Sequence, residues 1–62
     1  MNIYHIVFCK DDAEVTTIVR AKSLEDAKEK LKMAVAGEML YIDIHCSDGS
    51  EHRFVKMQGK EE

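Results

Sequence analysis

The sequence contains no proline or tryptophan, only three glycines and only two cysteines. Two cysteines cannot build the disulfide framework of a small secreted domain, and the N-terminus lacks the basic and apolar regions of a secretory signal. We therefore expect Cys9 and Cys46 to be free thiols and the protein to be cytoplasmic. No apolar run approaches the roughly 20 residues of a membrane-spanning helix, so we expect no membrane contact.

The chain also lacks an excess of positive charge. Its formal net charge is −3, and acidic and basic residues are interspersed along it. This balance argues against a large phosphate-binding surface and makes nucleic acid a disfavoured partner.

The 62 residues are enough for one domain but not for a large core. A chain this short buries only about 60% of the surface that it exposes when unfolded. Domains of this size usually add disulfides, a metal or a partner subunit. We expect a single α+β domain over residues 1–57 and a frayed tail over residues 58–62, which contains no apolar side chain.

Residues 21–37 form the one strong helix pattern. Ser23 stands where an N-cap belongs, and Gly37 stands where a left-handed residue commonly ends a helix. Acidic residues come first and lysines follow, which suits the helix dipole. The apolar side chains that recur at helical spacing are Leu24, Ala27, Leu31, Ala34 and Val35.

Strand-like runs rich in β-branched and aromatic residues flank this helix. They cover residues 3–9, 14–20, 39–46 and 51–57. Short connections join each pair into a hairpin, and a right-handed crossover through the helix places the first strand beside the third. The sequence therefore predicts a two-layer ββαββ sandwich of the α+β class, with a four-stranded antiparallel sheet in the order 2-1-3-4 and one helix on one face.

The lengths of the two hairpin turns decide which side chains face the helix. A two-residue turn at residues 11–12 pairs Phe8 with Val15 and places Phe8, Ile6 and Tyr4 on the helix side. A three-residue turn would exchange the faces of the second strand. The first arrangement puts the bulkier residues in the core, so we predict it.

The second hairpin contains an Asp-Gly pair, which is a strong turn signal. A two-residue turn at residues 48–49 pairs Ile44 with Arg53 and places Leu40 on the helix side. It also sets His45 directly opposite His52 on the other face, with Cβ atoms about 5 Å apart.

The face that one helix cannot cover is expected to carry apolar side chains and histidines. Its predicted partner-binding residues are Ile3, His5, Val7, Ile18, Tyr41, His45, His52 and Phe54. Soluble monomers rarely expose several hundred Å² of contiguous apolar surface, so we expect a homodimer or a protein partner there. The alternative is a monomer in which polar neighbours dilute the patch. The outer strand, residues 14–20, offers a second contact by strand addition.

Histidines on one face also raise the alternative of a zinc or nickel site near His45, His52 and Asp43. Their spacing matches no zinc motif, however. The chain has no nucleophile elbow, no C-x-x-C pair and no glycine-rich phosphate loop. We therefore expect no catalytic residue, no metal and no cofactor, and we predict that the protein is not an enzyme.

The stretch Val19-Arg20-Ala21-Lys22-Ser23-Leu24-Glu25-Asp26-Ala27 resembles strand-to-helix junctions in small phage and mobile-element proteins, and it is similar to the start of the helix in HicB-type antitoxins. Those antitoxins have an extra strand and a longer glycine-containing stretch before the helix, which this chain lacks. The resemblance carries over no site residue.

We predict a non-enzymatic protein-interaction module, in the manner of a phage or mobile-element accessory protein, that self-associates through the uncovered sheet face. The alternative is a small nucleic-acid-binding or transcription-regulating dimer, in which dimerisation would bring lysines and arginines together.

Overall fold

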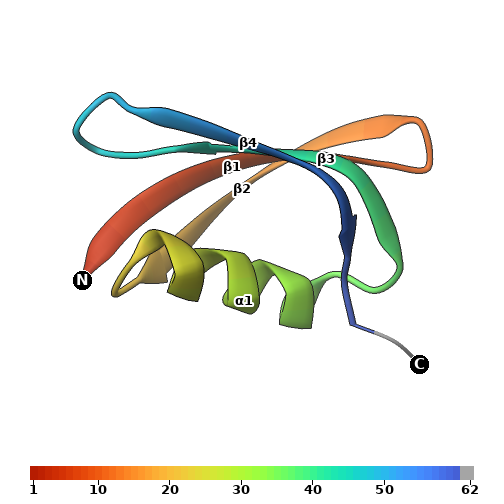
Figure 1. Cartoon of the computed structure of the whole chain (residues 1–62), viewed down its shortest axis with the longest axis horizontal. Helices are drawn as coiled ribbons and strands as arrows, with labels where there is room; N and C mark the ends of the chain where they lie inside the picture. Colours follow the sequence, from red (N-terminus) through yellow and green to blue (C-terminus); the bar gives the residue numbers. More distant parts are fainter. Residues whose placement is uncertain (61–62) are drawn as a thin grey trace.

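Four strands and one helix form two layers (Figure 1). The computed structural model describes residues 1–60, and its elements are β1 (Asn2–Lys10), β2 (Ala13–Ala21), α1 (Leu24–Ala34), β3 (Glu38–His45) and β4 (Glu51–Gln58). The sheet has the order β2-β1-β3-β4, and every neighbouring pair is antiparallel. Helix α1 lies against one face of this sheet. The predicted class, strand order and helix position are confirmed.

The β1–β2 hairpin has the predicted register. Asp11 and Asp12 both adopt left-handed backbone angles, with φ of 53° and 61°. This is the two-residue type I′ turn whose twist matches that of the flanking strands. Phe8 pairs with Val15, and the pairing continues without interruption to the far end of both strands.

Helix α1 begins as its sequence predicts and ends two residues earlier than predicted. The Ser23 hydroxyl accepts a hydrogen bond from the Asp26 backbone N–H at 3.2 Å, which satisfies one free donor of the first turn. The helix ends at Ala34, and Val35 is already extended. Gly37 has the expected positive φ, 88°, but it lies where the chain turns into β3 and does not cap the helix.

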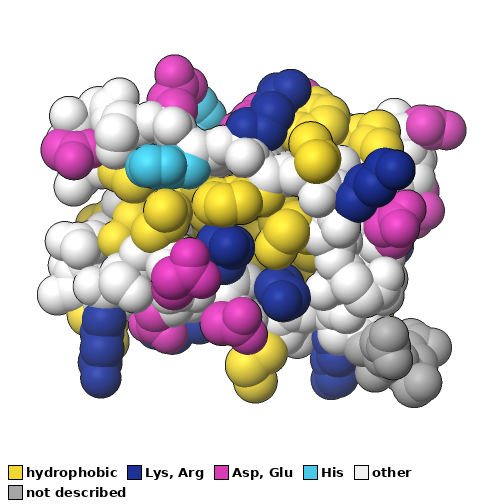
Figure 2. Space-filling model, in the orientation of Figure 1, with side chains coloured by type: hydrophobic (Ala, Val, Ile, Leu, Met, Phe, Trp, Pro, Cys, Tyr) yellow, Lys and Arg dark blue, Asp and Glu magenta, His cyan; other side chains and the backbone are white. Residues whose placement is uncertain are grey.

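The core lies between α1 and the covered face of the sheet. Its fully or nearly fully buried hydrophobic residues are Tyr4, Ile6, Phe8, Ala21, Ala27, Leu31, Met39, Ile42 and Ile44. Figure 2 shows hydrophobic side chains in a band between the two layers, with charged side chains on either side of it. The prediction that Tyr4, Ile6 and Phe8 face the helix is confirmed.

The register predicted for the β3–β4 hairpin is wrong by one residue. The loop has three residues, because the Cys46 N–H donates to the Ser50 carbonyl and the Gly49 N–H donates to the Cys46 carbonyl. Gly49 has φ of 93°, as in a type I turn followed by a glycine bulge. The Asp48 carboxylate holds this loop by accepting from the backbone N–H and the hydroxyl of Ser50.

This one-residue difference exchanges the faces of β4. Ile44 pairs with His52, and Ile42 pairs with Phe54. His52 and Phe54 therefore lie on the helix side and not on the uncovered face, which corrects two predicted positions. Phe54 packs against the core, and the Lys28 ammonium lies 4.0 Å from the centre of its ring.

A bend in the β3–β4 ribbon corrects a further position. Met39 is fully buried, whereas Leu40, predicted to face the helix, is 55% exposed. Opposite this point Lys56 has a left-handed φ of 53°. Alternation between the two faces is interrupted in both strands here, and the ribbon curves toward the end of α1 (Figure 1).

The C-terminal residues that the structure describes are part of the fold. Gln58 is the last residue of β4, Gly59 is buried, and the Lys60 N–H donates to the carbonyls of Lys32 and Val35 at the end of α1. The sequence predicted fraying from residue 58 onward because this segment has no apolar side chains. Residues 58–60 are instead held in the fold by these contacts. Residues 61 and 62 lie outside the described part of the chain. No helix of the described structure is long and apolar enough to cross a membrane.

Candidate functional site: the open face of the sheet

The candidate site is the sheet face that points away from α1, here called the open face. Alternation along the paired strands assigns its side chains. It contains Ile3, His5, Val7 and Cys9 of β1, Glu14, Thr16, Ile18 and Arg20 of β2, Tyr41, Asp43 and His45 of β3, and Glu51, Arg53 and Val55 of β4. Six predicted residues lie on it, namely Ile3, His5, Val7, Ile18, Tyr41 and His45.

The exposed apolar part of the open face is divided between the two sides of the sheet. Ile3 and Ile18 are 43% and 61% exposed on the β1–β2 side, and Val55 is 65% exposed on β4. Val55 was missing from the predicted set because the assumed register turned it toward the helix. The size of Phe54 could have indicated the correct register, because a buried phenylalanine side chain contributes more free energy than a buried valine.

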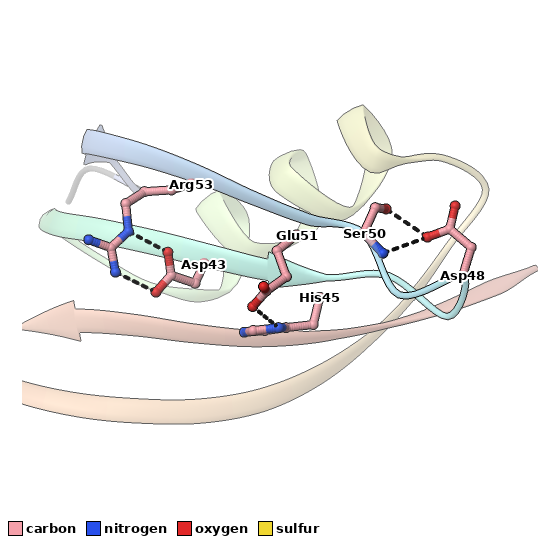
Figure 3. Close-up of polar contacts among 6 residues, drawn as sticks. All are labelled: Asp43, His45, Asp48, Ser50, Glu51 and Arg53. Atoms are coloured by element: carbon pink, nitrogen blue, oxygen red, sulfur yellow. Dashed lines mark hydrogen bonds and ion pairs between the residues drawn. The ribbon is translucent and has the colours of Figure 1, made fainter.

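Polar groups occupy the space between these apolar side chains. The Tyr41 hydroxyl donates to the Glu14 carboxylate at 2.5 Å, reaching from β3 across β1 to β2. The Arg53 guanidinium lies over the Tyr41 ring, 4.7 Å from its centre. Arg53 also donates to both oxygens of Asp43, at 2.6 and 2.8 Å (Figure 3). Side chains from three strands are thereby held in one arrangement.

This network changes the acid–base properties of its members. The two hydrogen bonds from Arg53 lower the pKa of Asp43 below its ordinary value. The hydrogen bond that Tyr41 donates to Glu14 favours the neutral phenol and raises the pKa of Tyr41. At neutral pH the Asp43–Arg53 ion pair is therefore intact and the Tyr41 phenol keeps its proton, so the charges of the network do not change in this range.

The histidines are arranged differently from the prediction. His45 lies opposite His5 on β1 and opposite Glu51 on β4, and its Nδ1 lies 2.9 Å from the Glu51 carboxylate (Figure 3). His52 lies on the other face, so the predicted His45–His52 pair is wrong. Residues 1–60 contain no group of three or more histidine, cysteine or acidic side chains placed to hold a metal ion.

The lysines of α1 do not form a free basic patch. Lys28, Lys30 and Lys32 each lie within 3.4 to 3.6 Å of an acidic side chain one turn earlier in the helix. The predicted pairs Glu25–Lys28 and Asp26–Lys30 are among them. Pairs at this spacing belong to a solvated helix surface.

The two thiols lie in different surroundings. Cys9 and Cys46 are both free and half-buried. Cys9 lies opposite Tyr41 on the open face, whereas Cys46 packs against the core. They are therefore not placed as a pair.

No protein-family model matches the sequence, and no curated protein and no solved structure matches the chain. The likeness to the start of the HicB-type helix thus remains a local one.

Proposed function

We propose that this protein is a small, non-enzymatic protein-interaction module that acts through the open face and that its partner there is a second copy of the chain. The observation that supports this is the single helix layer. Helix α1 covers one face, and Ile3, Ile18 and Val55 remain exposed on the other. Ile3 and Ile18 offer apolar contact area on one side of this face and Val55 offers it on the other, with the polar network between them.

The size of the open face fits a small homodimer. Four strands about 4.8 Å apart and about eight residues long, at roughly 3.3 Å per residue, give a flat area on the order of 500 Å². Two such faces in contact bury about 1,000 Å² or more, which is near the lower limit of specific protein interfaces.

The charges of the open face also allow contact with an identical face. Arg53 neutralises Asp43 within the same chain, and His45 lies beside Glu51. A sheet-to-sheet contact therefore does not bring together two unpaired clusters of one sign. The apolar side chains at the two sides supply the favourable contact area.

Sedimentation equilibrium between about 5 and 500 μM tests this proposal in the concentration range of weak interfaces. The test variant is Ile3→Lys with Val55→Lys, because both side chains are exposed and neither supports the core. The control is Met33→Lys, which places one such charge on an exposed apolar position of α1. We expect the double variant to lose face-to-face association and the control to keep it. Equal association of the two variants would overturn the proposal.

A further inference from the structure

Strand β2 is an outer strand of unusual regularity. It pairs with β1 over nine consecutive residues and has no bulge, proline or glycine. Its middle residues, 15–19, carry no charge. Natural proteins usually protect such an edge with a lysine, a proline or a bulge, because its free backbone groups can pair with another strand.

The hairpin geometry determines which backbone groups of β2 are free. Residues that flank a two-residue turn exchange backbone hydrogen bonds, so Ala13 and every second residue after it bond to β1. The N–H and C=O groups of the even-numbered residues, from Glu14 to Arg20, therefore point away from the sheet. The Lys30 ammonium agrees with this, because it donates to the outward Arg20 carbonyl at 2.9 Å.

Charges of opposite sign lie at the two ends of this edge. Asp12 and Glu14 stand at one end, and Arg20 and Lys22 stand at the other, at equal distances from Thr17. Asp12, Arg20 and Lys22 form no ion pair with another residue of the described chain. Glu14 binds the neutral Tyr41 hydroxyl through one oxygen.

We propose that two copies of this chain pair antiparallel through their β2 edges about a two-fold axis at Thr17. Glu14 then lies opposite the partner's Arg20, and Asp12, in the turn before β2, lies at the same end of the paired strands as the partner's Lys22. Thr16 lies opposite the partner's Ile18. This register joins outward-facing residues only, so roughly eight backbone hydrogen bonds form between the strands, two of them to Arg20 carbonyls that also accept from Lys30. A shift of two residues in either direction loses the Glu14–Arg20 contacts.

The pairing also covers an apolar groove. A groove of about 500 Å³ lies between β2 and α1, and its lining includes Val15, Val19, Leu31 and Ala34. Val15 of each copy lies opposite the partner's Val19 on this side of the joined strands. The second copy thus brings apolar side chains to a groove that α1 leaves open.

This site is separate from the open face, and the two contacts are compatible. Edge pairing joins two four-stranded sheets into one, with both helices on the same side. The two open faces then become one continuous surface, because residues opposite each other in antiparallel strands point to the same side. Either contact can exist without the other.

Disulfide trapping tests the register directly. In a background with Cys9→Ser and Cys46→Ser, Thr17→Cys places two thiols at the axis. Thr17 and the partner's Thr17 form a non-hydrogen-bonded pair with Cα atoms about 4.5 Å apart, within reach of a disulfide. Thr16→Cys is the matched control, because its two copies lie roughly 8 Å apart in this register, beyond that reach.

We expect Thr17→Cys to form the disulfide dimer at least tenfold faster than Thr16→Cys under mild oxidation. Equal rates, a faster Thr16→Cys or no dimer from either would overturn the proposed pairing. Adding Ile3→Lys and Val55→Lys to Thr17→Cys separates the two proposals. Trapping that persists there supports the edge contact independently of the open face, and trapping that is lost contradicts it.

A charge exchange tests the same pairing without cysteine. In the Ile3→Lys and Val55→Lys background, in which association through the open face is removed, Glu14→Arg and Arg20→Glu each place like charges opposite one another. We expect each to weaken the remaining association at least tenfold. The double exchange restores opposite charges across the axis and is expected to restore association. Loss in both single variants without recovery in the double variant would contradict the pairing, and so would no loss in either.

Discussion

Replacing Gly59 by alanine tests the contact between the C-terminal segment and the end of α1. A Cβ atom on residue 59 would overlap the Val35 carbonyl oxygen and lie 3.0 Å from the carbonyl carbon. It would also lie 3.1 Å from the Gly37 carbonyl oxygen. All three neighbouring atoms belong to the backbone, so no side-chain rotation relieves the overlap. The segment must move away from the helix.

The cost follows from the hydrogen bonds that this movement breaks. The Gly59 N–H donates to Gly37, the Lys60 N–H donates to Val35, and the Gly37 N–H donates to Lys60. At about 0.5–1.5 kcal/mol for each donor, the expected loss is about 2–4 kcal/mol. A domain of 62 residues has a total stability of about 3–9 kcal/mol, so the variant should lose a large part of it.

Urea denaturation followed by circular dichroism measures this loss. With a slope of about 1 kcal/mol per M for so small a domain, the midpoint should fall by about 2 M or more. Gly49→Ala is the matched control, because residue 49 has φ of 93° and no other atom within 4 Å of a Cβ position. It should lose only the backbone strain of an alanine at positive φ, about 1 kcal/mol. A Gly59→Ala midpoint equal to or above that of the control would refute the argument.

Other perturbations address the open face and the second hairpin. Arg53 lowers the pKa of Asp43 in the folded protein. The ion pair therefore stabilises the fold above the unfolded pKa near 3.9, and this stabilisation is lost as the pH falls through the folded pKa. The melting-temperature difference between wild type and Asp43→Asn should shrink below about pH 4. In an absorbance titration of the phenols, Glu14→Gln should lower the pKa of Tyr41, since that pKa is raised by the hydrogen bond to Glu14; an unchanged curve would contradict the bond. Deleting Ser47 leaves a two-residue turn that exchanges the faces of β4, so we expect the variant to unfold at a lower urea concentration than wild type.

The first hairpin and the helix could be predicted because local chemistry and burial agree there. Asp11 and Asp12 tolerate positive φ, and the register that they allow also buries Phe8. Ser23 precedes the apolar stripe and caps the helix as expected. Where two independent signals favour the same arrangement, a single sequence is enough to predict it.

The second hairpin was mispredicted because its local signal is ambiguous. Asp48-Gly49 suits a two-residue turn and also the last two positions of a three-residue loop, and these differ by one residue in register. The larger burial of Phe54 decides between them, together with the pairing of Arg53 with Asp43. Both are contacts between distant residues, which a local turn rule does not include.

The C-terminal segment and the bend were missed for a related reason. Apolar content predicts which residues enter a core, but Gly59 and Lys60 are held by backbone hydrogen bonds to α1 and not by side chains. The inward position of Met39 coincides with a left-handed Lys56 on the neighbouring strand. Neither the C-terminal hydrogen bonds nor the bend produces a recognisable pattern of apolar residues in the sequence.

The order of charges along β2 shows how sequence and structure combine. Asp12 and Glu14 precede Thr17 by the same distances at which Lys22 and Arg20 follow it, and this symmetry is visible in the sequence alone. It would have no consequence in a central strand, whose two neighbours belong to the same chain. Because β2 is an outer strand, a second β2 running antiparallel presents the same charges in reverse order, as the proposed pairing requires. In the proposed pairing, the outer position of β2 and the order of its charges together define the register.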